Sequence, residues 1–479
     1  MWECEWEEMK KQDKSIQEVV DSFQIINRLK PLDTFFGGRT NAVRLYYKVV
    51  DGEKIWYVDF TSLYPWVNKN MIYPVGHPTI ILEPGVTDLS DYFGLAQCTV
   101  LLPTELYHPV LPYRSGGKLT FPLCRKCVET EQPKPLTERS HQCVHSDEER
   151  CLTETWCTPK LMEAVKQGYV IKHIHEVWHF SLTSNDMFTS YVNTFLKIKQ
   201  EASGWPEWVS HDTTKSTQYV ENYEKHEGIK LEIDKIKKNP GRRSLAKMML
   251  NSFWGKYGQQ GNKSPVVAIT EPTCLYEIIE DDSKIVQALK IMNDEMVEII
   301  YKKVNDEQRI QPNTNIFIAC FTCWAQLKLY QDGLSKLNPQ QVLYFDTDSI
   351  IYSLKAGEPT LPLGDYLSKF TNELSEDDRI VEFASAGPKN YGYTTKKGKV
   401  ECKVRGFTLN THGQEQLNYK TLKQNVISEV TSPQRNKSTG ESVPRKIPIV
   451  DPHKISRDPE TKRLTTGEQI KNYLVVFDK

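Results

Sequence analysis

Acidic residues that can bind a metal ion stand at the ends of two predicted strands. In QVLYFDTDSIIYSL (341–354), Asp346 and Asp348 interrupt a run of β-branched and aromatic residues, which predicts a hairpin with these acids at its tip. Asp59 ends a similar run, WYVDF (56–60). Each pattern taken alone fits an ordinary polar turn as well as a sheet end that holds a metal.

A predicted helix after Asn239 carries side chains that suit a nucleoside triphosphate. Asn caps a helix, and the following Pro240 fits its first turn. Polar and aromatic side chains then recur at helical spacing along one stripe, which consists of Arg243, Lys247, Asn251 and Trp254. The cations can neutralise phosphate oxygens, and the aromatic ring can pack on a base. For this helix in isolation, a solvated basic face with Trp254 turned to the core is an equal alternative.

Together these residues describe phosphoryl transfer. Carboxylates from two turns can hold two Mg²⁺ ions roughly 3.5–4 Å apart, which activate an attacking oxygen and stabilise the leaving one. The cationic helix would hold the triphosphate. The sequence alone does not show that Asp59 and Asp348, which are far apart in the chain, converge.

A second group of metal-ligating residues lies between Asp59 and the cationic helix. It follows the patterns Cys-x2-Cys and Cys-x-His and consists of Cys124, Cys127, Cys143 and His145. Two such pairs suit a tetrahedral, structural Zn²⁺, with Cys151 and Cys157 as competing ligands. A loop of reduced cysteines is the alternative, and the spacing favours zinc.

The elements that must position these residues are predicted from pattern. The chain of 479 residues is long enough for roughly two to four subdomains. Residues 41–66 read as two strands joined at the hairpin dipeptide Asp51-Gly52. Residues 160–180 predict a helix, a glycine turn and a strand, the polar stretch 205–230 predicts loops, and 313–330 predicts a buried helix.

Composition narrows the class of protein. The formal net charge is −1, so a nucleic acid would have to bind to local clusters such as 234–258, which holds seven basic residues and one acidic residue. No apolar run approaches the roughly 20 residues of a membrane-spanning helix. The first residues lack the apolar core of a signal peptide. An intracellular protein without a membrane partner is expected, with its 11 cysteines reduced or metal-bound.

Three motifs resemble those of a known enzyme family. DFTSLYP (59–65), KMMLNSFWG (247–255) and YFDTDS (344–349) are similar to the three polymerase motifs of family B DNA polymerases, in the same order. FFGG (35–38) resembles the Tyr-x-Gly-Gly element of protein-primed members, and KNY (389–391) resembles their Lys-x-Tyr motif. The likeness covers nearly the whole chain and is closest to polymerases of Maverick/Polinton transposons and related viruses.

The resemblance implies a role for each matching residue. Asp59 and Asp348 would bind two Mg²⁺ ions, with Asp346 in support. Nucleotide contacts would come from Phe60, Ser62, Leu63, Tyr64, Arg243, Lys247, Asn251 and Trp254. Contacts to DNA would come from Gly37, Gly38, Thr347, Ser349, Lys389 and Tyr391. The sequence departs from the family pattern at Trp254, where Tyr is usual, and at Phe35.

The resemblance also implies an α+β, right-hand fold with an antiparallel palm sheet, helical fingers, a thumb and two insertions. The expected order is a lead-in segment (1–34), a first palm segment (35–78), a first insertion with the cysteines (79–205), fingers (206–258), a second insertion (259–312), a second palm segment (313–418) and a thumb (419–479). The lead-in before Phe35 is too short for the exonuclease domain of full-length members, so the chain is expected to be a fragment, a truncated gene product or a polymerase core without proofreading.

The function implied is template-directed DNA synthesis in the replication of a transposon or virus-like element. The partners would be primer–template DNA, dNTPs and a terminal priming protein. Among enzymes, a reverse transcriptase or an RNA polymerase is the alternative. The residues of the three motifs favour a DNA template. An alternative from another class is a truncated, non-catalytic remnant that only binds nucleic acid. This alternative is disfavoured because the motif residues are intact, namely Asp59, Asp348, Lys247 and Asn251.

Overall fold

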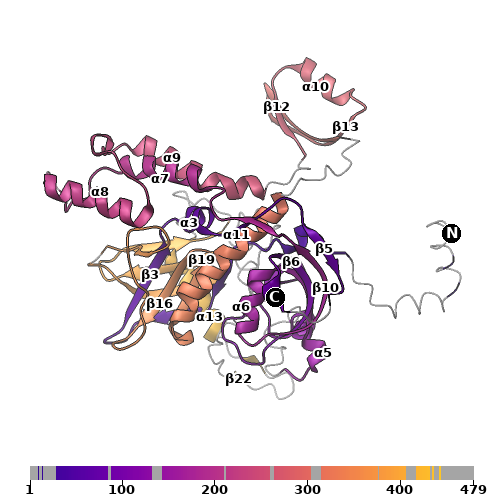
Figure 1. Ribbon diagram of the computed structural model, residues 1–479, viewed down its shortest axis with the longest axis horizontal. Helices are drawn as coiled ribbons and strands as arrows, with labels where there is room; N and C mark the ends of the chain where they lie inside the picture. Colours follow the sequence, from indigo (N-terminus) through magenta and orange to yellow (C-terminus); the bar gives the residue numbers. More distant parts are fainter. Residues whose placement is uncertain are drawn as a thin grey trace.

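The computed structural model of the chain describes residues 28–84, 88–131, 143–209, 212–258, 264–303, 314–375, 377–405 and 417–431, together with Met9, Asp13 and the short strands Gln434–Arg435 (β21) and Ser442–Val443 (β22). A central antiparallel sheet is flanked by a helical lobe and by two further lobes that each have a sheet of their own (Figure 1). This layout confirms the predicted α+β class and fits the right-hand organisation. No helix in the described ranges is both long and apolar enough to cross a membrane.

The central sheet has nine strands, in the order β1-β15-β16-β3-β18-β19-β20, with β17 beside β3 and β2 beside β18. Their bounds are Thr40–Ala42 (β1), Tyr46–Lys48 (β2), Lys54–Phe60 (β3), Val342–Asp346 (β15), Ser349–Leu354 (β16), Phe370–Asn372 (β17), Ile380–Gly387 (β18), Asn390–Thr395 (β19) and Val400–Lys403 (β20). The predicted hairpin over 341–354 is confirmed, since β15 and β16 pair and Asp346 lies opposite Ser349.

Both faces of this sheet are covered, which explains why β15 and β16 are almost continuously apolar. On one face, Phe345 and Ile350 share a core with Phe321 and other residues of helix α11 (Thr314–Lys328). The helix begins where the sequence predicts and continues as a π-helical turn, Leu329–Gly333. On the other face, Tyr344 packs with aromatic residues of β18 and β19.

The predicted hairpin at Asp51-Gly52 is wrong. The turn itself forms, and Gly52 adopts the positive φ of 84° that such a turn requires. The flanking strands do not pair with each other, however. β2 pairs with β18, and β3 pairs mainly with β16 and β17. Local turn chemistry was therefore correct, while the strand partners come from residues more than 280 positions later in the chain.

The predicted first insertion has its own sheet, with strands in the order β5-β10-β6-β9. These strands are Thr79–Leu82 (β5), Gly94–Leu101 (β6), Leu152–Cys157 (β9) and Val170–His179 (β10). The other elements here are the hairpin Tyr113–Ser115 (β7) and Lys118–Thr120 (β8) and the helices Arg125–Glu131 (α4), Asp147–Arg150 (α5) and Thr158–Lys166 (α6). The predicted helix, glycine turn and strand over 160–180 are confirmed as α6, Gly168 and β10.

Three helices form the lobe that carries the predicted triphosphate stripe. They are Thr189–Glu201 (α7), Thr213–Glu227 (α8) and Pro240–Tyr257 (α9). α9 begins as predicted, with the Asn239 side chain accepting from the Arg242 N–H. α7, which the predicted boundary at 205 places with the first insertion, packs against α9 and shares a core with it through Leu196 and Leu250.

The stretch 205–230 includes loops at both ends, as predicted, but its middle forms a helix that the sequence did not predict, α8, over residues 213–227. Its sequence is polar, but Asp212 caps its N-terminus by accepting from the N–H groups of Thr214 and Lys215. Gly228 ends it in the left-handed conformation. The helix is held by a few buried residues such as Val220 and Tyr223.

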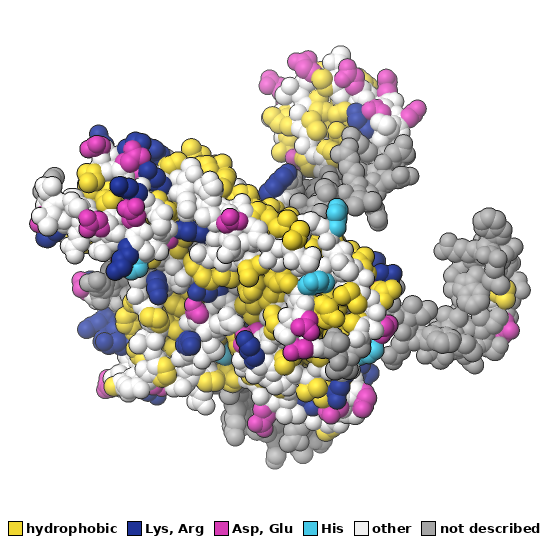
Figure 2. All heavy atoms as spheres, in the orientation of Figure 1, with side chains coloured by type: hydrophobic (Ala, Val, Ile, Leu, Met, Phe, Trp, Pro, Cys, Tyr) yellow, Lys and Arg dark blue, Asp and Glu magenta, His cyan; other side chains and the backbone are white. Residues whose placement is uncertain are grey.

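The remaining elements are short. Leu63–Asn70 (α3) follows β3, and Tyr73–Val75 (β4) pairs with Leu182–Ser184 (β11). The predicted second insertion contains a small three-stranded sheet with one helix, formed by Val266–Ile269 (β12), Pro272–Ile279 (α10), Lys284–Asn293 (β13) and Met296–Lys303 (β14). It stands apart in Figure 1, and Figure 2 shows apolar side chains on its surface. Tyr419–Thr431 (α13) packs on β18, and most of the predicted thumb lies outside the described residues.

Candidate active site

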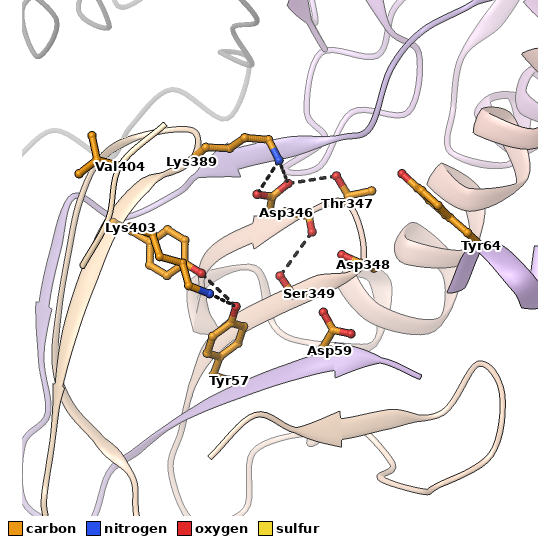
Figure 3. Close-up of a pocket in the computed structure, with 11 residues that line it drawn as sticks. Tyr57, Asp59, Tyr64, Asp346, Thr347, Asp348, Ser349, Lys389, Lys403 and Val404 are labelled. Carbon is orange, nitrogen blue, oxygen red and sulfur yellow. Dashed lines mark hydrogen bonds and ion pairs between the residues drawn. The ribbon is translucent and has the colours of Figure 1, made fainter. Parts of the chain in front are cut away.

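Strands β3 and β16 bring Asp59 and Asp348 together. The two strands pair antiparallel with Asp59 opposite Ser349, and the Phe60 N–H donates to the Asp348 carbonyl oxygen at 2.8 Å. Asp59 therefore lies beside Asp348, which stands in the turn between β15 and β16 (Figure 3). The convergence that the sequence left open is a consequence of this strand register.

The two carboxylates resist being charged together. Burial raises the pKa of Asp59, and repulsion from Asp348 and Glu373 raises it further, while Lys247 opposes the shift. Burial also raises the pKa of Asp348, with Asp346 adding to the effect. A divalent cation between such carboxylates would offset both the repulsion and the loss of hydration. Hard oxygen donors in a half-buried setting therefore fit Mg²⁺.

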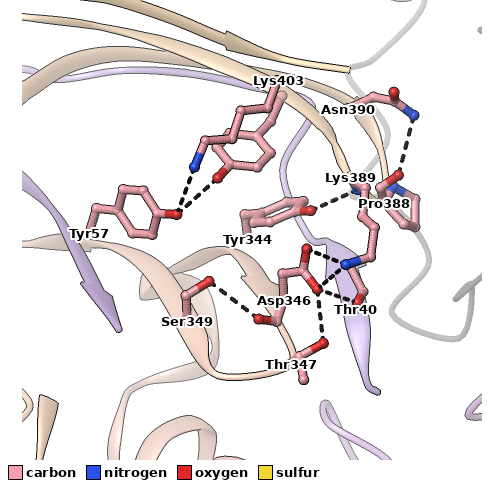
Figure 4. A network of polar contacts seen from close by, with 11 residues as sticks. Thr40, Tyr57, Tyr344, Asp346, Thr347, Ser349, Pro388, Lys389, Asn390 and Lys403 are labelled. Carbon is pink, nitrogen blue, oxygen red and sulfur yellow. Dashed lines mark hydrogen bonds and ion pairs between the residues drawn. The ribbon is translucent and has the colours of Figure 1, made fainter. Parts of the chain in front are cut away.

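Asp346 is held by other groups and points away from this pair. Its Oδ1 accepts from Thr40 Oγ1 at 2.8 Å and from Thr347 Oγ1 at 3.0 Å, and Lys389 Nζ lies 2.9 and 3.0 Å from its two oxygens (Figure 4). An ion pair and two hydroxyl donors satisfy the carboxylate. This arrangement agrees with a supporting role for Asp346 and ties Lys389 to the acid turn.

Backbone strain is concentrated around the pocket. Ser62, Thr347 and Lys389 have φ of 55°, 60° and 63°, and they are three of the five non-glycine residues with positive φ in the described chain. Tertiary hydrogen bonds hold two of them, since the Thr347 N–H donates to the Arg39 carbonyl and the Lys389 N–H to the Tyr344 hydroxyl, both at 2.8 Å. Strain of this kind persists where the surroundings over-determine a functional geometry.

Gly38 lies against the acid turn. A Cβ at this position would be 2.5 Å from Thr347 Oγ1, so only glycine fits without a shift. The neighbouring Gly37 carbonyl accepts from the side chain of Gln326 on α11. The Gly-Gly element is thus fixed between α11 and the residue that separates Asp346 from Asp348.

Gly38→Ala should displace Thr347 and, with it, the turn that carries Asp346 and Asp348. If these acids move by about 1 Å, the rate of primer extension should fall by roughly 100-fold. The measurement is kcat for primer extension, with circular dichroism to check folding. Thr347→Ala removes the clashing atoms and provides the control background. In the Thr347→Ala background, adding Gly38→Ala should lower kcat only slightly further. An equal loss in both backgrounds would show that the contact with Thr347 is not the cause.

An open pocket of about 450 Å³ surrounds these groups (Figure 3). It is lined by Tyr57, Asp59, Tyr64, Asp346, Thr347, Asp348, Ser349, Lys389, Tyr391, Lys403 and Val404. Eight of these eleven residues carry a role implied by the sequence. The exceptions are Tyr57, Lys403 and Val404.

The predicted stripe on α9 is exposed, and its cations lie near the pocket. Arg243, Lys247 and Asn251 are exposed and Trp254 is 38% exposed, so the alternative in which Trp254 turns into the core does not hold. Lys247 is near enough to Asp59 to lower its pKa. Arg243 Nε donates to Ser203 Oγ at 3.1 Å. The stripe therefore faces the side of the pocket where the carboxylates lie.

Tyr64 connects the stripe to the carboxylates. Its ring makes edge contacts with Trp254 and with Phe321 of α11, at centroid distances of 5.9 and 4.9 Å. It also lines the pocket beside Asp348 (Figure 3). An aromatic wall thus stands between α9 and the acid pair, supported from behind by α11.

Three other predicted residues are buried. Phe60 and Leu63 are buried in the core at 1% exposure, and Phe60 stacks on Phe370. Ser349 is also buried, with its hydroxyl donating to the Asp346 carbonyl. Any ligand contact from Phe60 or Leu63 would use the backbone, whereas Ser349 lines the pocket.

Two cations at this site were missed by sequence reasoning. Lys199 of α7 donates to Ser62 Oγ at 2.9 Å, and burial together with Arg243 and Lys247 lowers its pKa to about 8. Lys403 lies over the rings of Tyr57 and Tyr391. Neither lysine stands in a motif, and no spacing signal marks them.

One family model agrees with the resemblance over part of the chain. Residues 33–217 match the family model described as DNA polymerase type B, organellar and viral. No curated protein sequence matches the chain. Phi29 DNA polymerase in an orthorhombic crystal form has a similar structure, with a TM-score of 0.49, 15% identity and coverage of 82% of this chain and 57% of that chain. Phi29 DNA polymerase complexed with primer-template DNA and incoming nucleotide substrates matches with a TM-score of 0.48 and 15% identity. That match covers 86% of this chain and 59% of the Phi29 chain. This chain thus spans less than two thirds of either Phi29 polymerase chain.

Proposed function

We propose that this chain is a DNA-directed DNA polymerase of the family B type, which extends a primer 3′-hydroxyl with dNTPs during replication of a transposon or virus-like element. The observation that carries the proposal is that Asp59, near the end of β3, lies beside Asp348, in the turn that precedes β16, with the cationic face of α9 near them. A terminal protein would be the priming partner in this lineage.

In this proposal the regions of a right hand map onto the described elements. The central sheet is the palm, α7 to α9 are the fingers, and α13 begins the thumb. The two separate sheets, β5-β10-β6-β9 and β12-β14-β13, are the insertions. Placing α7 in the fingers moves the predicted boundary at 205 toward the N-terminus, because α7 shares its core with α9.

Asp59 and Asp348 would hold the metal ions, with their carboxylates close together where the central strands β3 and β16 meet the acid turn. Mg²⁺ bound there would activate the primer hydroxyl and neutralise the charge that develops on the leaving pyrophosphate. Asp346 would keep the turn in place through its ion pair with Lys389. The strained conformations of Thr347 and Lys389 would set the positions of these side chains.

The triphosphate would lie against Lys247, Arg243 and Lys199. Three cations from two packed helices can bind phosphate oxygens while the nucleotide's base reaches Trp254 and Asn251. On the opposite side of the pocket, Lys389 and Lys403 are positioned to bind phosphates of the primer strand. Charge on both sides of the acid pair suits a polyanionic substrate that crosses it.

A primer-extension assay tests the proposal. The full chain is incubated with Mg²⁺, dNTPs and a primer annealed to a DNA or an RNA template, with Asp348→Asn as the control. Extension on DNA that the control lacks supports the proposal. Extension only on RNA would indicate a reverse transcriptase. Binding of primer–template without extension on either template would identify a non-catalytic remnant.

Tyr64→Val should relax the choice of sugar. Tyr64 is five residues after Asp59, and its ring forms a wall of the pocket supported by Phe321, so it would leave little room for a ribose 2′-hydroxyl. A pocket that is only apolar rejects an added hydroxyl by about 100-fold, and a rigid wall can exceed this. The measurement is kcat/KM for ATP and dATP opposite the same template base. Tyr64→Phe keeps the ring and should keep the selectivity. An unchanged ratio in Tyr64→Val would make Tyr64 a packing residue.

A further inference from the structure

Three cysteines and one histidine of the first insertion bring their ligand atoms together. The Sγ atoms of Cys124, Cys127 and Cys143 lie 3.5, 3.3 and 3.6 Å from Nδ1 of His145. All four ligand atoms lie within 4.8 Å of one another. For Zn–S bonds of about 2.3 Å and Zn–N bonds of about 2.0 Å at tetrahedral angles, the S···N separation is about 3.5 Å. The four atoms therefore already have the spacing of a tetrahedral site.

The structure also decides between the competing cysteines. Cys151 is not in the cluster, and its Sγ lies 3.1 Å from the Asp147 carbonyl oxygen. Cys157 is buried in a different place, where it interacts with Cys320 and Cys323. Within the cluster, the Cys127 N–H points at Cys124 Sγ at 3.4 Å, a contact that stabilises a thiolate.

We propose that Cys124, Cys127, Cys143 and His145 form a structural Zn²⁺ site. Three thiolates and an imidazole are soft donors that select zinc over the Mg²⁺ proposed at the carboxylates. Four protein ligands close the coordination sphere and leave no position for water or substrate, which is typical of a structural rather than a catalytic site. The ion would join α4 to the segment that precedes α5, two pieces of chain that lie on either side of residues 132–142.

Contacts from this site lead toward the Gly-Gly element. Glu129 of α4 accepts from the Tyr113 hydroxyl at 3.1 Å. Arg114, which follows Tyr113 in the chain, donates to the Phe35 carbonyl, and its guanidinium lies 5.5 Å from the centroid of the Phe36 ring. Zinc would fix α4, and α4 would in turn help to fix the segment that holds Phe35. This second step rests on the proposed function, because it assigns the Gly-Gly element to DNA binding.

Elemental analysis tests the metal itself. Full-length protein purified under reducing conditions without chelator should contain about one zinc per chain. The double variant Cys124→Ser with Cys127→Ser should lose it, whereas Cys151→Ser, the matched neighbour outside the cluster, should keep it. Co²⁺ in place of zinc should give the visible absorption of a tetrahedral thiolate site. Absence of zinc after reconstitution, or unchanged zinc in the double variant, would overturn the proposal.

A reversible experiment separates the ion's role from a folding defect. A zinc-selective chelator is applied to the wild-type protein with Mg²⁺ in excess, and zinc is then restored. Removal should increase proteolytic cleavage within 124–150 and weaken primer–template binding several-fold, with kcat for extension unchanged, and zinc should reverse both effects. Unchanged cleavage would refute a structural role. Unchanged DNA affinity with increased cleavage would refute only the link to Phe35.

Discussion

Asp59→Asn and Asp348→Asn should each lower kcat for primer extension by roughly 1,000-fold or more, because each removes an anionic ligand of the Mg²⁺ ions proposed to neutralise the charge of the transition state. Both variants keep the size of the side chain, so the pairing of β3 and β16 should survive. The measurement is single-turnover extension at saturating dNTP. Asp91→Asn, an acid of the first insertion outside the pocket, is the control. A near-normal rate for either pocket variant would remove these residues from the catalytic site.

The same substitutions should stabilise the protein in the absence of divalent ions. The pKa values of Asp59 and Asp348 are raised above the ordinary 3.8, so the folded state binds more protons than the unfolded state above that pH. Stability should therefore fall as the pH rises through this interval, and the loss should be complete above the raised values. At pH 8 without metal, Asp59→Asn should melt at a higher temperature than wild type.

Added Mg²⁺ should reverse that order, because it binds only the folded wild-type site. The melting temperature of the wild type should rise with Mg²⁺ concentration, and that of Asp59→Asn should change much less. A variant that is less stable than wild type at pH 8 without metal would mean that the two acids are satisfied by the protein alone. Thermal melts at pH 4, where both acids are protonated, supply the reference.

Lys247→Ala should lower kcat/KM for dNTPs by roughly 10- to 100-fold, the effect of losing one hydrogen bond to a charged group. Lys256→Ala is the matched control, since it lies nine residues later on α9 and thus about half a turn away. If both lysines have equal effects, the helix contributes only diffuse charge. That effect would fade with added salt, unlike a direct contact.

The neighbouring Lys199 adds a pH signature to this experiment. Its pKa is lowered to about 8 by burial and by Arg243 and Lys247, so it loses its charge as the pH rises through that value. KM for dNTPs should accordingly increase above pH 8 in the wild type. In Lys247→Ala the increase should begin at a higher pH, because one repelling charge is gone. Lys199→Ala should abolish it.

The sequence predicted the residues of this site better than their arrangement. Asp59, Asp348 and the stripe on α9 could be predicted because each stands in a local sequence pattern, either a strand run that contains an acid or a helical spacing of polar and aromatic residues. The contact between the two acids depends on the register of β3 with β16, and no local signal encodes a partner so far along the chain. The wrong prediction of a hairpin at Asp51-Gly52 has the same origin, because β2 pairs with the distant strand β18 and not with β3.

Composition misled where a few positions decide the structure. The polar stretch 213–227 forms a helix because Asp212 and Gly228 define its ends and a few residues such as Tyr223 anchor it. Lys199 could not be found from its own neighbourhood, which reads as an ordinary helix. It becomes a member of the site only because α7 packs on α9 and brings its ammonium group to Ser62.

The central position of β3 has a consequence for synthesis on the ribosome. Its neighbours in the sheet, β16, β17 and β18, all lie at least 280 residues later in the chain. At about 5–20 residues per second, this strand emerges roughly 15–60 s before any partner exists. During that interval Ile55, Val58 and Phe60 have no sheet to join, whereas the first insertion can complete its own. The nascent chain should therefore depend on chaperones at this strand, and translation speed should affect the yield of active protein.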